Sequence, residues 1–328
     1  MIYRPLYSNL PKIRKDSANK IASYLISHKR CTRRDIAEYA SISDMSASKA
    51  VASLFDSGII SEKEQKNPVT KRPCGVISIS QDNTYIIIDI SGKAYTAYSM
   101  NCDFNVTHQY NYKYQSIFSQ LDNLSIFLER AHKNLSDNIS HFNGICVIIR
   151  KDLDDLTEIL NMVERNFSHK PDAVIDIGDA VYHLAHSNVD YHLPVNSLFY
   201  INIGSGCESY FISGDQIMKC NPHKLIGKNN TLIGDMIDSC VSATELYEII
   251  FDIFNCASAM LDPEVLALES DRFVLGSTMA FNLSKKLKIN FPDRRRLLIS
   301  DKLPHLYIKG ALLALIHTLI VDILSSSN

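Results

Sequence analysis

Short hydroxyl side chains and basic side chains gather in two stretches near the start of the chain. The first stretch carries four serines and one lysine, namely Ser43, Ser46, Ser48, Lys49 and Ser53. The second carries three cations, namely Lys66, Lys71 and Arg72. Hydroxyls and cations donate hydrogen bonds to phosphate oxygens and to base edges in the grooves of DNA. These residue types predict a nucleic-acid-binding surface if the fold places them on one side.

The charge of the chain is divided in the same way. Residues 1–75 hold 14 Lys and Arg against 7 Asp and Glu, a net charge of +7, so the remainder carries −9 within a total of −2. Basic surfaces release the counterions that condense on nucleic acids, which favours binding. A merely solvated basic surface would show the same count, so the fold has to decide between the two interpretations.

Three helices are predicted to position the first stretch. The first covers residues 17–28, with Ser17 as its N-cap. Thr32 caps a second helix, RRDIAEYA, and Asp35 stands three residues later at the capping-box position. After a short turn, the third helix runs along DMSASKAVASLFDSG and ends at Gly58, which can adopt a positive φ.

The third helix has two faces of different chemistry. Ala47, Ala50, Val51 and Leu54 recur at helical spacing and are expected to turn inward. The opposite face presents the hydroxyls and the lysine. A strand from Ile59, a polar tip EKEQKNPVTKRP and a returning strand CGVISIS then predict a basic β-hairpin. Residues 1–80 are therefore predicted to form a winged helix-turn-helix that binds double-stranded DNA, with a helical protein-interaction module as the alternative.

The rest of the chain, residues 81–328, predicts an α/β body. TYIIIDI is a continuous apolar run typical of a buried central strand, and two alternating strands follow it. A second round of strand, turn and paired strands begins at LFYINIGSG. The repeat of this pattern at Asp89 and again at Gly204 predicts two related lobes with a cleft between them, as in actin-like ATPases. An unrelated α/β domain is the alternative.

The order of these motifs resembles the ROK family of repressors and sugar kinases. The resemblance spans about Ser17 to Ser325 and rests on several short matches. They are SDMSASKAVASLFDSGIIS in the helix-turn-helix, KRP in the wing, DISGKA at 89–94, GDA at 178–180, INIGSG at 201–206, VSATELYE at 241–248 and KGALLA at 309–314. It implies an N-terminal winged helix-turn-helix followed by a two-lobed, actin-like ROK body.

This chain departs from the kinases of that family at the residues that perform their chemistry. Their first phosphate turn is DxGGT, whereas the turn here is DISGK, and their NDAN sequence becomes GDAV around Asp179. In the second turn, Glu208 would repel a phosphate. The resemblance thus implies a vestigial sugar and nucleotide site, formed by Asp89, Gly92, Asp179, Gly204 and Gly206, with no catalytic residue and no cofactor.

The zinc site that the resemblance implies is also depleted. Leu225 and Lys228 replace the glutamate and the histidine of the GEIGH segment. Met236 stands where the last zinc cysteine belongs, and Cys240 has no cysteine neighbours at ligand spacing. Zinc requires about four ligands, so no metal is expected.

These observations predict a sequence-specific, DNA-binding transcriptional regulator, a repressor that acts as a homodimer or higher homo-oligomer. The effector is left open between a sugar and a protein partner, and an ATP-dependent sugar kinase is the enzymatic alternative. No apolar run reaches the ~18 residues of a membrane span, since His317 and Asp322 interrupt the longest candidate. The N-terminus lacks a signal-peptide pattern. A cytoplasmic protein without a membrane partner is expected.

Overall fold

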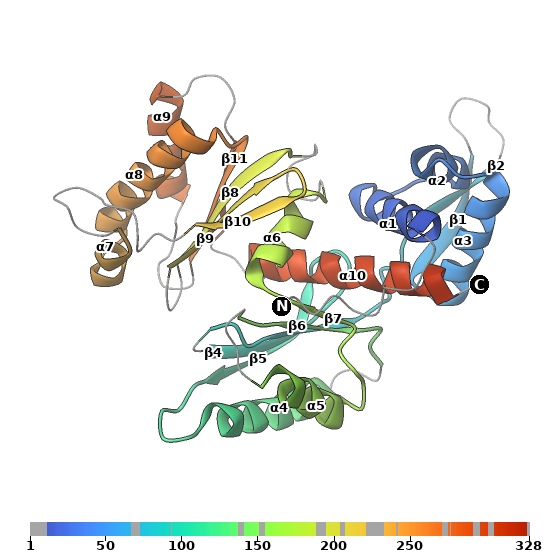
Figure 1. Ribbon diagram of the computed structural model, residues 1–328, viewed down its shortest axis with the longest axis horizontal. Helices are drawn as coiled ribbons and strands as arrows, with labels where there is room; N and C mark the ends of the chain where they lie inside the picture. The colour runs from blue at the N-terminus through green and yellow to red at the C-terminus, as the bar shows by residue number, and fades with distance from the viewer. Residues whose placement is uncertain are drawn as a thin grey trace. The chain divides into compact units, whose positions relative to one another are not determined.

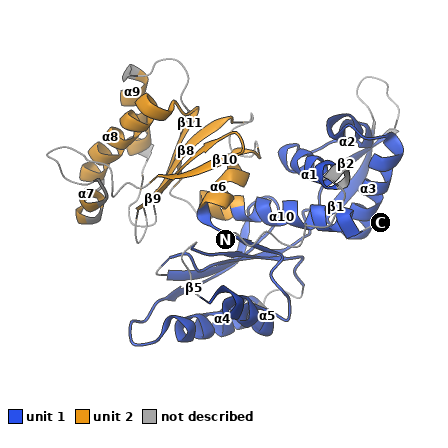
Figure 2. Ribbon diagram, viewed as in Figure 1, with its two compact units in different colours: residues 1–177, 311–328 blue, residues 178–310 orange. Residues whose placement is uncertain are grey.

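The computed structural model divides the chain into two compact units, residues 1–177 with 311–328 and residues 178–310 (Figure 2). The residues that the structure describes are 12–66, 73–92, 94–136, 141–150, 155–187, 195–203, 207–220, 233–240, 242–270, 275, 277–290, 296–300 and 305–326. Lys71, Arg72, Gly204, Gly206, Leu225 and Lys228, which sequence patterns single out, lie outside them.

The first described residues form three helices and a hairpin, here called the head (Figure 1). Its elements are α1 (Lys12–Ser27), α2 (Arg33–Ala40), α3 (Asp44–Asp56), β1 (Ile60–Lys66) and β2 (Pro73–Ile79). The two strands are antiparallel, and a bridge between Cys31 and Ile77 ties the hairpin to the α1–α2 connection. The prediction that Ser17 caps α1 is wrong, because the helix already begins at Lys12. The preceding segment KIRKD is rich in residues of high helix propensity and extends the helix.

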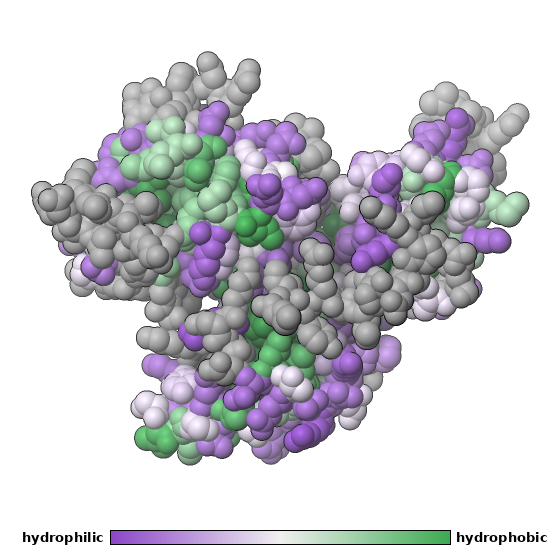
Figure 3. Space-filling model, in the orientation of Figure 1, coloured by the Kyte–Doolittle hydropathy of each residue, from purple (hydrophilic) through white to green (hydrophobic). Residues whose placement is uncertain are grey.

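A five-stranded sheet follows in the order β5-β4-β3-β6-β7, here called the first sheet. Its strands are β3 (Tyr85–Asp89), β4 (Ala94–Met100), β5 (Val106–Lys113), β6 (Ile145–Ile148) and β7 (Ala173–Ile175). Helices α4 (Gln120–Ser136) and α5 (Leu156–Phe167) bury Phe127 and Val163 against it. Figure 3 shows hydrophilic residues over much of their outer face. Helix α4 begins at Gln120, where the Ser119 hydroxyl accepts a hydrogen bond from the Asp122 amide.

The second unit repeats this arrangement, with a second sheet in the order β10-β9-β8-β11-β12. Its strands are β8 (Ser197–Ile203), β9 (Cys207–Ser213), β10 (Gln216–Cys220), β11 (Val265–Ser270) and β12 (Arg296–Ser300). Its helices are α6 (Ile177–Ala185), α7 (Ile233–Ser239), α8 (Ala243–Leu261) and α9 (Ser277–Asn290). In each sheet an antiparallel three-stranded meander is followed by two parallel strands. The predicted repeat of strand, turn and hairpin is confirmed as a repeat of sheet topology.

Helix α10 (Leu306–Ser326) starts in the second unit and continues in the first. By length and composition it is the one helix of the described chain that could cross a membrane, and 61% of its apolar window is buried. Core helices pass the same test, so this is weak support for a span. At its start Gly310 lies so near α6 that a Cβ there would be 2.0 Å from the Ala180 carbonyl oxygen.

Candidate nucleic-acid interface and vestigial ligand site

Helix α2 is fixed at both ends by local interactions. The Asp35 amide donates to Thr32 Oγ1 at 3.3 Å, and the Thr32 amide donates to Asp35 Oδ2 at 2.8 Å. This reciprocal pair is the predicted capping box, formed with Asp in place of Glu or Gln. The helix ends at Ser41, whose φ of 56° turns the chain toward α3.

Helix α3 ends before a glycine, as predicted, and starts after Ser43, which the sequence pattern predicts as a DNA contact and the structure shows as the N-cap. Ser43 Oγ accepts a hydrogen bond from the Ser46 amide at 3.2 Å and lies 2.9 Å from Ser46 Oγ. After the helix, Gly58 has a φ of 75°, which few other residues adopt at low cost. The structure thus gives the Ser43 hydroxyl a capping role.

The predicted DNA-facing side chains of α3 divide into two groups. Ser46, Ser48 and Lys49 are exposed, on the side away from buried Ala47 and its neighbours Val51 and Leu54. Ser53 is half-buried, and its hydroxyl donates to the Lys49 carbonyl oxygen at 3.2 Å. The structure therefore brings Ser46, Ser48 and Lys49 together on one exposed surface, while Ser53 is bonded within its own helix.

The hairpin of the head is anchored to α2 by an ion pair that the sequence did not suggest. Arg33 forms two hydrogen bonds with the Glu62 carboxylate on β1, one of them 2.7 Å from Nη2 to Oε2. Gly75 on β2 leaves the room for it, since a Cβ there would lie 1.9 Å from Glu62 Oε1. Lys66 closes β1 opposite Pro73.

The first predicted phosphate turn is closed by its own residues. Buried Asp89, at the end of β3, accepts two hydrogen bonds at Oδ1 from Ser91, one from the amide at 2.9 Å and one from the hydroxyl at 2.6 Å. Gly92, the remaining glycine of that turn, is exposed. The serine that replaces a glycine of the kinase motif thus forms a local hydrogen-bonded turn with the aspartate.

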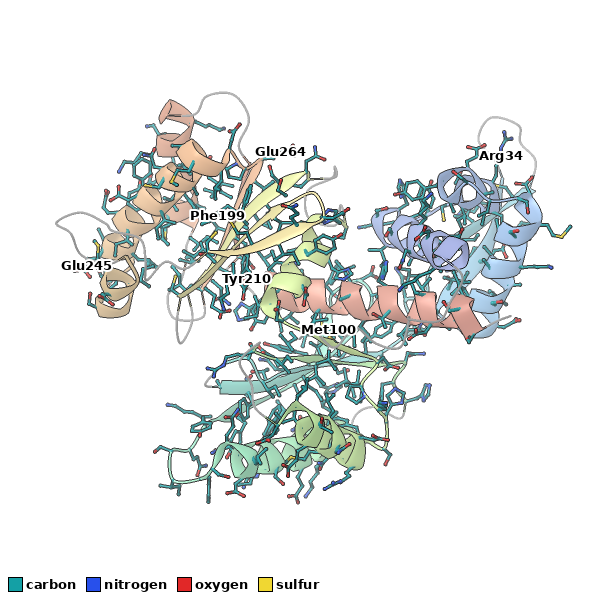
Figure 4. All side chains as sticks on the ribbon, viewed as in Figure 1. Arg34, Met100, Phe199, Tyr210, Glu245 and Glu264 are labelled. Carbon is teal, nitrogen blue, oxygen red and sulfur yellow. The ribbon has the colours of Figure 1, made fainter. Side chains whose placement is uncertain are left out.

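The second predicted site, in the other unit, carries a set of charged and phenolic groups. Asp179 lies in the first turn of α6 and is half-buried. Burial raises the pKa of Tyr210 (labelled in Figure 4) above its usual range, and the negative charges of Glu208 and, more weakly, Asp179 raise it further. Tyr210 donates to Glu208 at 3.2 Å, and Lys219 forms an ion pair with Glu208 at 3.0 Å.

This pairing changes the electrostatics expected from the sequence. Glu208 was expected to repel a phosphate, but Lys219 on the neighbouring strand pairs with its carboxylate and reduces that repulsion. Strand pairing explains the contact, because Lys219 stands opposite Tyr210 in the β9–β10 register. The sequence of β10 alone does not predict this ion pair, because the contact depends on the register of the β9–β10 hairpin.

Two residues at positions of the family's zinc loop, Met236 and Cys240, contact their own protein neighbours. The Cys240 thiol is buried and donates to the Ser242 carbonyl oxygen at 3.2 Å. Met236 is half-buried in α7 and packs against the core of the second unit. Within the described residues no group of three or more His, Cys, Asp or Glu side chains has an arrangement that could hold a metal ion.

The paired sheet topologies define a mixed α/β protein with an actin-like fold, preceded by the head. No protein-family model and no curated protein sequence matches the chain. Among solved structures, a ROK family transcriptional regulator, a homologue of the E. coli MLC protein, matches with a TM-score of 0.63 at 12% identity. The match covers 95% of this chain and 99% of that one. The chain therefore has the fold of the ROK family, as its motifs predict.

Two further ROK proteins have similar structures over a smaller share of this chain. A ROK family glucokinase from Streptomyces griseus, solved with glucose and AMPPNP, has a TM-score of 0.49 at 11% identity and covers 70% of this chain and 98% of its own. A ROK family protein from Streptococcus pneumoniae, solved with sucrose, has 0.49 at 10% identity and covers 71% and 97%. Likenesses this weak do not bear on the function of this chain.

Proposed function

We propose that the chain is a sequence-specific, DNA-binding transcriptional regulator, a repressor that acts in the cytoplasm as a homodimer. In this proposal the head is a winged helix-turn-helix and α3 is its recognition helix. The observation that carries the proposal is the two-sided character of α3, with Ala47, Val51 and Leu54 buried and Ser48 and Lys49 exposed on the other side. The net charge of +7 on residues 1–75 supports a polyanionic partner.

A dimer would present two such helices to one face of DNA. Helix-turn-helix dimers place their recognition helices in successive major grooves, roughly 34 Å apart, so the operator should be nearly palindromic. The α/β body would supply the dimer contacts and the response to an effector. Two effectors stay open, a sugar and a protein partner, because Asp179 is kept while Gly178 and Val181 offer no side-chain amide to a sugar hydroxyl.

An ATP-dependent sugar kinase is the second candidate, favoured only by the fold and by Asp179. Two contacts weigh against it: Ser91 bonds Asp89 within the first turn, and Glu208 stands as an ion pair with Lys219 after the second. We therefore propose a non-catalytic body without a cofactor. Incubation with ATP and a panel of hexoses tests this, and phosphoryl transfer that is lost in Asp179→Asn would establish the kinase instead.

The DNA-binding proposal is tested by selection from a random duplex library with the purified full chain. A near-palindromic motif whose binding weakens steeply with salt is expected. Reversing two predicted contacts together, in Lys49→Glu with Arg72→Glu, should weaken binding to the selected site by about 100-fold or more. The matched control, Lys113→Glu with Lys285→Glu, makes the same charge change at exposed positions outside the head and should bind nearly as wild type. Equal losses in both pairs would contradict the assignment of the interface.

A further inference from the structure

The outward side of α3 has an apolar member. At about 100° per residue, Met45, Lys49 and Ala52 share one line along the helix, opposite the buried line through Ala47, Val51 and Leu54. All three residues of the outward line are exposed. We call Met45, Lys49 and Ala52 the outer ridge of α3.

Met45 is the most exposed of the large apolar side chains described in the head, at 69%. Exposure of a single apolar residue is common and needs no explanation by itself. Its position is what matters: Met45 is the second residue of α3, and the N-terminal residues of a recognition helix are those that reach base edges. An unbranched thioether also adapts its shape to a partner surface.

Charge around Met45 favours bases over phosphates as its neighbours. Asp44, the residue before it, is exposed and negatively charged. A phosphate beside that carboxylate would be repelled, whereas base edges carry no net charge. Farther along the outer ridge, Lys49 can meet a phosphate or a guanine, and Ala52 is small enough to let the helix approach the groove closely.

We infer that Met45 is a specificity-determining residue that contacts the C5-methyl group of a thymine in each half-site. Among the four base pairs, thymine alone presents a methyl group in the major groove, and that methyl is the apolar partner available to this side chain. The inference rests on the proposed function and adds to it an apolar contact with one base, which the hydrogen-bonding groups of Ser46, Ser48 and Lys49 do not supply.

The test removes the methyl group from the DNA and the thioether from the protein separately and together. Each thymine of the selected half-site is replaced in turn by deoxyuridine, which has the same hydrogen-bonding groups without the methyl. At one position wild-type binding should weaken about fourfold, the value of one buried methyl group. Met45→Ala should show the same loss on the thymine site and no further loss on the deoxyuridine site.

Two controls separate this inference from the proposed function. Phe55→Ala, at the far end of α3 and 51% exposed, should keep the full deoxyuridine penalty. Lys49→Gln should reduce the slope of log affinity against log salt by roughly one, and Met45→Ala should leave that slope unchanged. If Met45→Ala keeps the full penalty at every thymine, the contact is refuted while DNA binding stands. If the full chain selects no DNA motif, the proposed function is overturned and this inference with it.

Discussion

Tyr200 and Tyr210 lie opposite each other on β8 and β9. Their two hydrogen bonds differ in burial, so the contribution of the buried bond to the free energy of unfolding can be predicted by comparison with the more exposed one. Tyr200 and Tyr210 are register partners, and each hydroxyl donates to a glutamate. The Tyr200 acceptor, Glu269, is fully buried and also accepts from the Leu306 amide at 2.6 Å, the first residue of α10. The Tyr210 acceptor, Glu208, has a side chain that is 31% exposed and is paired with Lys219.

Deleting the two hydroxyls should therefore have unequal effects on stability. In Tyr200→Phe the Glu269 carboxylate loses a donor that water cannot replace, which costs about 2–3 kcal/mol for a buried charged group. In Tyr210→Phe water and Lys219 can satisfy Glu208, so the loss should stay below about 1 kcal/mol. The pKa of Tyr200 is raised by burial first and by Glu269 second, which agrees with a hydroxyl that stays protonated as the donor.

Urea unfolding followed by far-ultraviolet circular dichroism measures the difference. With a slope of about 2–3 kcal/mol/M, Tyr200→Phe should lower the midpoint by about 1 M and Tyr210→Phe by less than half of that. Binding of the selected DNA in buffer serves as a check that both variants are folded before unfolding begins. Equal midpoint shifts in the two variants, or a larger shift in Tyr210→Phe, would refute the reasoning from burial.

Two further predictions concern α10. Burial lowers the pKa of His317 to about 4, against a hydrogen bond to the Asn19 backbone that raises it, so the folded pKa lies below the unfolded value near 6.5. The contribution of this group to the free energy of unfolding is complete above pH 6.5 and should fall by about 3 kcal/mol as the pH drops from 6.5 through 4. Acid unfolding tests this: His317→Gln should show a flatter dependence of stability on pH than the wild type. The control His141→Gln, at an exposed position, should keep the wild-type dependence. In Gly310→Ala the new Cβ would lie 2.0 Å from a backbone oxygen of α6, so a loss of about 2–3 kcal/mol is expected in thermal unfolding. A gain of about 1 kcal/mol, the usual effect of this change in a helix, would show that the approach is not limiting.

Elements defined by interactions within a few residues were predictable from the sequence. The capping box at Thr32 and the glycine after α3 are both signalled by residues at most four positions apart. The strands β3 and β8 were predictable because continuous apolar runs have few other places to lie. Where such signals are weak the boundaries moved, as at the start of α1, because polar residues of good helix propensity carry no mark that separates them from a loop.

Contacts between residues far apart in the sequence were not predictable. Arg33 and Glu62 are 29 positions apart, and Glu269 lies 69 positions from Tyr200 and 37 from Leu306. Each of these charges looks like an ordinary surface residue until the fold brings its partner to it. Met45 gives no signal in the sequence for a different reason: it is apolar and forms no strong hydrogen bonds, and its position on the outer ridge of α3 becomes informative only beside Lys49 and Ala52.

The distribution of satisfied polar groups favours the proposal that a ligand binds to side chains of the head and not to those of the body. In the body, groups at the two kinase-like turns are engaged with their own neighbours, Ser91 with Asp89 and Lys219 with Glu208. A ligand at either turn would have to displace these bonds and repay their loss. On α3, Ser48 and Lys49 are exposed to solvent, so binding a phosphate or a base there exchanges water for ligand without breaking the fold. Selection from a DNA library therefore tests α3, the surface at which binding does not require hydrogen bonds within the protein to break.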